Sequence, residues 1–179
     1  LEGFPLSCTE QLASKAIGLS AALDEAAPQE RAAALQRQVD GILSRQRFDG
    51  SFGLWSAQGD PEEWVTPYAV EALLRARAAG AAVAPAGLDA ALANLDEMAE
   101  ESSHSTPVFR AHQAARLHAL AMAGRVRMGA ARRLLDELDQ LPTPLARAQL
   151  GAVFARTGDN ERANRAFASA LAAPTRNDW

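Results

Sequence analysis

The chain has 179 residues, of which 48% are hydrophobic and 22% are charged, and its 18 Lys and Arg against 22 Asp and Glu give a formal net charge of −4. This length fits a single globular domain of the usual ~100–200 residues, and the mildly acidic balance lacks the basic footprint of nucleic-acid-binding proteins. No apolar run approaches the roughly 20 residues of a transmembrane helix. Three histidines and one cysteine at these spacings do not match a structural zinc site, so no metal or other cofactor is expected.

Apolar side chains recur at intervals of three and four residues along the whole chain, which is the period of an amphipathic α-helix. No stretch alternates apolar and polar residues for long enough to predict a β-strand. The pattern predicts eight helices, over residues 12–23, 35–42, 64–73, 88–95, 107–124, 128–138, 144–154 and 163–171. The expected fold is therefore all-α, built from successive antiparallel helical hairpins. Helix pairs that repeat about every 35–45 residues suggest a solenoid or a closed toroid.

Capping residues support these helix boundaries. Asp60-Pro61 predicts an N-cap followed by proline at the first helical position, with Glu63 completing a capping box. Thr106-Pro107 and Thr143-Pro144 predict two further helix starts of the same kind. Three glycines follow periodic segments, where a left-handed C-cap is expected: Gly80, Gly124 and Gly158.

The single cysteine, Cys8, lies in a segment that predicts a helix start. Ser7 and Glu10 have the spacing of a capping box, which places Cys8 in the first turn, where the helix N-terminus favours a thiolate. Gln11 lies one turn further along, on the same side. A sulfur held beside a side-chain amide can attack its carbonyl carbon and expel ammonia, leaving an internal thioester. The alternative is a small buried cysteine beside an ordinary helical glutamine.

Four segments together resemble a known family. The run Cys8-Thr9-Glu10-Gln11 resembles the Cys-x-Glu-Gln thioester motif of the alpha-2-macroglobulin and complement family. Bacterial members typically have Tyr-Pro-Tyr-Gly before the cysteine, whereas this chain has Phe4-Pro5-Leu6-Ser7 and departs at the second aromatic residue and at the glycine. Residues 50–55, 64–69 and 141–150 also resemble segments of bacterial macroglobulin thioester domains, so the resemblance covers nearly the whole chain.

The resemblance implies an alpha/alpha toroid of about a dozen helices, of which about eight are present here. Residues 1–179 are accordingly expected to form one domain, a partial complement-like thioester domain of a larger protein. The family implies a broad-spectrum endopeptidase inhibitor that traps proteases and acylates them once, and not an enzyme. Expected partners are host or foreign proteases and the other macroglobulin domains of the same chain, with no nucleic acid and no direct membrane contact. The implied location is extracytoplasmic, in the periplasm, with an inner-membrane lipid anchor elsewhere in the full-length protein.

The same resemblance assigns roles to individual residues. Cys8 and Gln11 would form the thioester, with Glu10 as a motif residue. Some complement-type members pass the acyl group through a histidine about a hundred positions after the cysteine, and His104 is the nearest match. His112 and His118 lie six residues apart, about 120° around a helix, and do not converge.

Aromatic residues are the candidates for keeping water from the thioester, because most of them lie in the first half of the chain. The alternative is that each belongs to the hydrophobic core. The candidates are Phe4, Phe52, Trp55, Trp64 and Tyr68.

Two other functions remain open. Residues 46–55 also resemble the repeats of terpene cyclases and of prenyltransferase beta subunits, which are alpha/alpha toroids too. A cyclase needs an acidic cluster to ionise its substrate, and the nearest candidates are the carboxylates at 60–63 and 136–139, which fit a helix cap and a solvated face. The third possibility is a helical-repeat interaction module without chemistry.

Overall fold

The computed structural model describes residues 7–22, 28–100 and 106–172, and it confirms the all-α prediction. In this described part there are eight α-helices, one short 3-10 helix and no β-strand. The elements are α1 (Thr9–Ala21), α2 (Pro28–Leu43), α3 (Val65–Ala78), α4 (Pro85–Glu100), α5 (Pro107–Met122), α6 (Met128–Asp136), η1 (Leu138–Gln140), α7 (Pro144–Arg156) and α8 (Asn160–Ala172). No helix among the described residues is long and apolar enough to cross a membrane.

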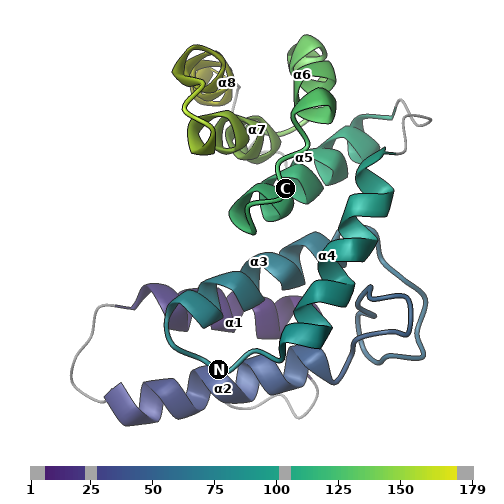
Figure 1. The fold of residues 1–179 in the computed structure, drawn as a ribbon, viewed down its shortest axis with the longest axis vertical. Coiled ribbons are helices and arrows are strands. Elements are labelled where there is room, and N and C mark those ends of the chain that lie inside the picture. The colour runs from purple at the N-terminus through teal and green to yellow at the C-terminus, as the bar shows by residue number, and fades with distance from the viewer. Residues whose placement is uncertain (1–6, 23–27, 101–105, 173–179) are drawn as a thin grey trace, which may run out of the picture. The chain divides into compact units, whose positions relative to one another are not determined.

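The contacts within the chain group into two compact units, residues 1–95 and 96–179, and α4 contributes residues to both. In the first unit α1 packs against α2 and α3, and Figure 1 shows it lying between them. Ala13 and Ala16 are fully buried on α1, as are Val39 and Ile42 on α2. Small side chains on α1 let the three helices approach closely, so the first helix sits in the core of its unit.

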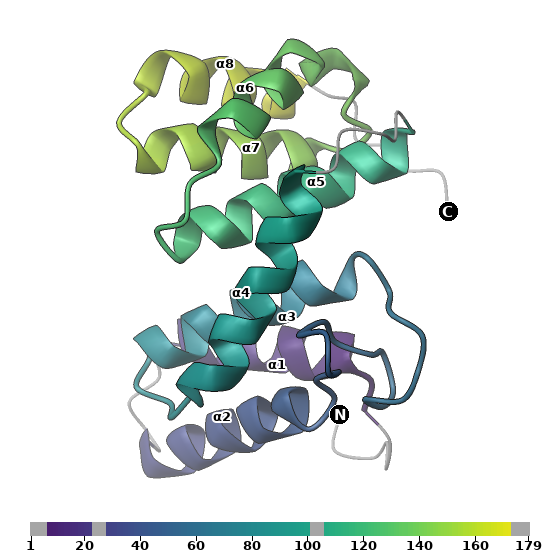
Figure 2. The ribbon, with the colours of Figure 1, turned by 45° about the vertical axis from the view of Figure 1, so that its right-hand side comes forward.

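In the second unit α7 packs against α8 and α5 (Figure 2). Gly151 on α7 packs tightly against α8, because a Cβ there would lie 2.7 Å from the ring of Phe167. Arg116 on α5 is fully buried, with its guanidinium 5.4 Å from the centre of the Phe109 ring. A cation over an aromatic face offsets part of the cost of burying its charge.

Two of the three predicted proline-start caps are confirmed. The Thr106 hydroxyl accepts a hydrogen bond from the Phe109 N–H at 3.2 Å, and Thr143 does the same for Ala146 at 3.1 Å. The three predicted C-cap glycines all have positive φ. Threonine and glycine therefore mark these helix ends as local chemistry requires.

The third predicted start, at Asp60-Pro61, is wrong. Pro61 instead pairs with Gly53 in an isolated antiparallel bridge, and α3 begins only at Val65, after a turn closed by the Val65 N–H on the Glu62 carbonyl. Residues 44–64 thus form one long connection, the α2–α3 loop. A tertiary pairing has replaced the local cap that the sequence favours.

A tight turn in the α2–α3 loop is held by Asp49. Its Oδ1 accepts hydrogen bonds from the Ser51 hydroxyl at 2.6 Å and the Ser51 N–H at 3.0 Å, and lies 3.7 Å from Arg47 Nε. Burial alone raises the pKa of Asp49, but the Ser51 hydrogen bonds and the Arg47 charge outweigh it, so the pKa is lowered overall. Gly50 follows at φ +84°, and a Cβ there would lie 2.3 Å from the Ala90 carbonyl oxygen. The ionised carboxylate therefore stabilises the turn.

We expect the packing of α7 on α8 to tolerate no side chain at residue 151. Gly151→Ala should reduce the free energy of unfolding by about 1–3 kcal/mol, because the new methyl group collides with the Phe167 ring. Urea unfolding of this chain measures the change. Gly129→Ala on α6 is the control, since its Cβ would meet only Arg133 at 3.6 Å. Equal stability of the two variants would contradict this account of the helix contact.

We expect Asp49→Asn to destabilise the chain at neutral pH by no more than about 1 kcal/mol, as for other partly exposed charges. Because the folded-state pKa of Asp49 is lowered, its contribution is present above the unfolded-state pKa and is lost as the pH falls through the folded-state value. The difference between the wild type and Asp49→Asn in unfolding free energy should therefore shrink on acidification. Denaturant titrations across the acid range measure this difference, and a difference that does not depend on pH would argue against a stabilising charge on Asp49 in the turn.

Candidate functional site

Cys8 occupies the N-cap of α1, one position earlier in the helix than predicted. Its backbone is extended, with φ −74° and ψ 168°, and its carbonyl accepts the first helical hydrogen bond, from the Leu12 N–H at 3.1 Å. The predicted capping box of Ser7 and Glu10 is wrong, because the reciprocal pair is Cys8 and Gln11. The helix starts one residue later because the Thr9 N–H is bonded outside the helix, to the Leu54 carbonyl at 2.8 Å.

The capping box brings the two predicted reactive groups into one turn. The side-chain carbonyl oxygen of Gln11 accepts a hydrogen bond from the Cys8 N–H at 3.2 Å, while the Gln11 backbone N–H faces the Cys8 side chain. The amide is thus folded back over the residue that carries the sulfur. A backbone N–H on a carbonyl oxygen polarises the carbonyl and would stabilise negative charge on that oxygen after nucleophilic addition.

The backbone on both sides of Cys8 is held by the α2–α3 loop and the end of α2. Before the cysteine, Arg45 donates from Nη2 to the Ser7 carbonyl at 2.7 Å and from Nη1 to the Gly41 carbonyl at 2.6 Å. After it, the Thr9 N–H binds the Leu54 carbonyl, and the Thr9 hydroxyl donates to the Gly53 carbonyl at 2.6 Å. We call these four hydrogen bonds the clamp.

The Thr9 side of the clamp is buried and rests on a supported loop. Thr9 is fully buried and Cys8 is 8% exposed. The Phe52 N–H donates to the Thr66 hydroxyl at 3.1 Å, and the Phe52 side chain is fully buried. Gly53 has no room for a Cβ, which would lie 2.0 Å from the Ser56 carbonyl oxygen. The loop therefore presents two carbonyl oxygens to Thr9 in a fixed position.

Sequence reasoning did not identify Thr9, Arg45 or Thr66 as supports of the cysteine. Arg45 adjoins residues 46–55, which resemble the repeats of terpene cyclases and of prenyltransferase beta subunits. Thr66 lies in segment 64–69, which resembles bacterial macroglobulin thioester domains. These motifs are the part of the sequence that could have pointed to the three supports. Their polar residues act on backbone groups up to 44 positions away, which helical periodicity cannot show.

Glu10 also lies beside the sulfur. Its Oε2 is 3.9 Å from Cys8 Sγ, within the longer range of hydrogen bonds that sulfur makes, and its Oε1 accepts from the Ser14 hydroxyl at 3.0 Å. Ser14 in turn lies 2.9 Å from the Tyr68 hydroxyl on α3. The three motif residues predicted to take part in this chemistry therefore meet at one helix end. They are Cys8, Glu10 and Gln11.

The candidate aromatic shield divides into core and surface residues. Phe52 belongs to the core, which is the alternative considered for it, and Tyr68 is half-buried. Trp55 is 61% exposed and Trp64 is 37% exposed in this chain. Phe4 lies outside the described residues. The two tryptophans leave apolar surface open on the α2–α3 loop and at its junction with α3.

The first unit, which holds this site, contains no histidine. His104, the candidate acyl acceptor, lies outside the described residues. His112 and His118 are on α5 in the second unit, with His118 almost buried. Among the described residues no group of three or more His, Cys, Asp or Glu could hold a metal ion.

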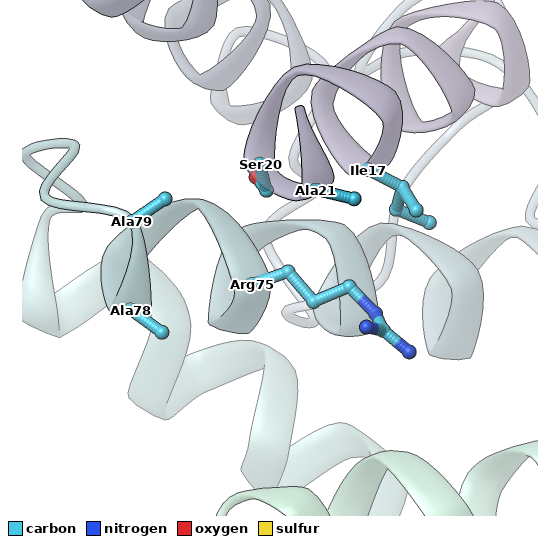
Figure 3. A pocket seen from close by; sticks show the side chains of 6 residues that line it. All are labelled: Ile17, Ser20, Ala21, Arg75, Ala78 and Ala79. Atoms are coloured by element: carbon cyan, nitrogen blue, oxygen red, sulfur yellow. The ribbon is translucent and has the colours of Figure 1, made fainter. Parts of the chain in front are cut away.

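A cavity of about 250 Å³ lies further along α1 and α3 (Figure 3). Its lining is mainly aliphatic: Ile17, Ser20, Ala21, Arg75, Ala78 and Ala79. The Ser20 hydroxyl donates a hydrogen bond to the Ala16 carbonyl, and Arg75 forms an ion pair with Glu71 at 2.8 Å. The cavity therefore offers no converging reactive groups, and we place the candidate site at the start of α1.

Comparison with known proteins gives a consistent family. No family model matches the chain. An alpha-2-macroglobulin from Xylella fastidiosa is 30% identical over 94% of this chain and 11% of the relative, and one from Escherichia coli is 26% identical over 99% of this chain and 12% of the relative. The chain thus spans about a ninth of the length of these relatives.

Solved structures of bacterial alpha-2-macroglobulins have the same fold. A native structure from Escherichia coli matches 99% of this chain and 30% of its own, with a TM-score of 0.85 and 26% identity. A Salmonella structure reacted with methylamine matches 99% of this chain and 13% of its own, with a TM-score of 0.87 and 25% identity. A trypsin-activated Escherichia coli structure matches 96% of this chain and 13% of its own, with a TM-score of 0.82 and 25% identity. These matches confirm the alpha/alpha toroid class expected from the sequence. The chain belongs to the bacterial alpha-2-macroglobulin family.

Proposed function

We propose that residues 1–179 are a partial thioester domain of a protease trap, in which Cys8 and Gln11 form an internal thioester that acylates a captured protease. The trap is a single-use inhibitor, because the thioester is consumed by the reaction. The proposal is supported by the family and by two of its solved members, one activated by trypsin and one reacted with methylamine. A primary amine such as methylamine is the kind of nucleophile that opens a thioester.

The observation that carries the proposal is the reciprocal capping box of Cys8 and Gln11. Sulfur adds to the side-chain carbonyl carbon of Gln11, the S–C bond forms, and the carbonyl oxygen gains negative charge. The Cys8 N–H already binds that oxygen, at the positive end of the α1 dipole. The C–N bond then breaks and ammonia leaves, so the thiol and the amide become a thioester and one ammonia.

The clamp contributes by removing freedom from the reacting pair. Because hydrogen bonds hold Ser7 and Thr9, the backbone of Cys8 cannot turn away from Gln11 without breaking them, and the bond from Thr9 to Gly53 is buried. Holding two groups in reacting geometry lowers the entropic part of the barrier. Thr9 and Arg45 are therefore positioning residues in this proposal.

The remaining parts of the proposal concern the whole protein. Its partners would be proteases and the other macroglobulin domains of the same chain, and its location would be the periplasm, with a lipid anchor in the inner membrane. The exposed Trp55 and Trp64 would lie under a covering domain that keeps water from the thioester. His104 remains the candidate acyl acceptor.

The cyclase alternative lacks support from the described carboxylates. Asp60, Glu62 and Glu63 lie exposed in the α2–α3 loop. Glu137 pairs with Arg110 across the second unit, as a structural ion pair. The helical-repeat module differs from our proposal in one respect, since it assigns no reaction to Cys8.

We expect the full-length protein to contain the thioester. Its intact mass should be lower than the sequence mass by one ammonia, and methylamine should add its own mass at Gln11 and release one titratable thiol. Cys8→Ala and Gln11→Ala should each keep the full mass and take up no methylamine. A wild-type protein with full mass and a freely titrating Cys8 would contradict the proposed function.

We expect Thr9→Val to lower the fraction of protein that carries the thioester, because the buried Gly53 carbonyl loses its donor at a cost of about 1–3 kcal/mol. Thr9→Ser keeps the hydroxyl and is the matched control. Mass spectrometry of the full-length variants gives the fraction, and thermal unfolding shows whether each has folded. A folded Thr9→Val protein with the full wild-type fraction would remove Thr9 from the positioning residues.

A further inference from the structure

Three side chains form a hydrogen-bonded chain that ends on the sulfur. Glu10 and Ser14 lie four residues apart on α1 and so share a face, and Tyr68 reaches them from α3. The distances are 3.9 Å from Cys8 Sγ to Glu10 Oε2, 3.0 Å from Ser14 Oγ to Glu10 Oε1, and 2.9 Å between the hydroxyls of Ser14 and Tyr68. Nothing in the capping of α1 requires this chain, because Gln11 already satisfies the Cys8 N–H.

The direction of the chain follows from counting protons. A serine hydroxyl has one proton, and Ser14 uses it to donate a hydrogen bond to Glu10. The hydrogen bond between Ser14 and Tyr68 must then be donated by the Tyr68 hydroxyl. Each hydroxyl thus donates its hydrogen bond toward the Glu10 carboxylate. These hydrogen bonds hold Oε1 of Glu10, and Oε2 remains directed at the Cys8 sulfur.

Thioester formation needs a carrier for one proton. The thiol must lose its proton to become nucleophilic, and the amide nitrogen must gain one to leave as ammonia. Among the described side chains, Glu10 is the one that accepts a hydrogen bond from Cys8 Sγ, and it lies one residue from Gln11. A carboxylate in this position can take the first proton and return it in the second step.

We propose that Glu10 carries the proton in thioester formation and that Ser14 and Tyr68 are positioning residues which aim its carboxylate at Cys8. This inference rests on the proposed function. Glu10 Oε2 takes the thiol proton, the thiolate adds to the Gln11 carbonyl carbon, and Glu10 gives the proton to the Gln11 nitrogen as the C–N bond breaks. Ammonia leaves and Glu10 returns to its ionised form, so atoms and charge balance.

The role assigned to Tyr68 differs from that of an aromatic shield. A shield depends on the ring, which phenylalanine would keep, whereas positioning depends on the hydroxyl alone. Tyr68→Phe therefore separates the two roles with the loss of a single oxygen atom. Ser14→Thr keeps a hydroxyl and Ser14→Ala removes it, which gives a second matched pair on α1.

The test follows thioester formation over time in freshly synthesised full-length protein, by intact mass and loss of free thiol. We expect Glu10→Gln to slow formation by about 10²–10⁴-fold, the usual contribution of a general acid–base group. Tyr68→Phe and Ser14→Ala should each slow it by a smaller factor, and combining them should be no slower than Ser14→Ala alone. Ser14→Thr should be close to wild type, as should Lys15→Gln, a neighbouring control outside the chain.

Chemical rescue separates proton transfer from a structural role. Added formate should accelerate thioester formation in Glu10→Ala, whereas chloride at the same ionic strength should not. If the wild type forms the thioester and Glu10→Gln and Tyr68→Phe form it equally fast, this inference is overturned while the proposed function stands. If the wild type loses no ammonia, the proposed function itself fails. Thermal unfolding of each variant confirms that it has folded, and Tyr68→Phe provides the test should Glu10→Gln not fold.

Discussion

The start of α1 depends on one buried side chain, Thr9. Its N–H donates a hydrogen bond to the Leu54 carbonyl, and its hydroxyl donates one to the Gly53 carbonyl. The first residue of α1 is therefore bonded to a loop more than forty positions away. Buried carbonyls are costly to leave without a donor. This requirement fixes the register of α1, makes Cys8 the N-cap and gives Gln11 the third helical position.

The chemistry follows from that register. With Cys8 one position later, inside the first turn, its N–H would be one of the unpaired donors of the helix start and its sulfur would face a different neighbour. As the N-cap it has an extended backbone, and the Gln11 amide folds back onto it. The same contact that caps the start of the helix brings the Cys8 thiol and the Gln11 amide into one turn. In the function proposed above, capping and reactivity are two consequences of one geometry.

Periodicity predicted the existence of every helix, because an amphipathic stripe is a property of neighbouring residues. It failed where distant residues compete with local preference. Asp60-Pro61 has the chemistry of a helix start, yet Pro61 pairs with Gly53 and the helix waits until Val65. Ser7 and Glu10 have the spacing of a capping box, yet the Thr9 contact moves the box by one residue.

The candidate site was predictable in its reactive pair and not in its supports. Cys8 and Gln11 are neighbours along one helix, so spacing alone brings them together. Arg45 and Tyr68 lie tens of residues away, and only the packing of α2 and α3 on α1 delivers them. The buried Arg116 also escaped prediction, although its guanidinium lies over the ring of Phe109 on the same helix.

The Leu54 carbonyl has a further significance, because the next residue along the chain is Trp55, whose indole is largely exposed. Trp55 is joined by one peptide bond to the Leu54 carbonyl, which accepts the hydrogen bond from the Thr9 N–H. Thr9 is in turn the next residue after Cys8. The exposed indole is thus separated from the cysteine by only two peptide links and one hydrogen bond, so a surface that covered Trp55 would lie close along the chain to the backbone that holds Cys8.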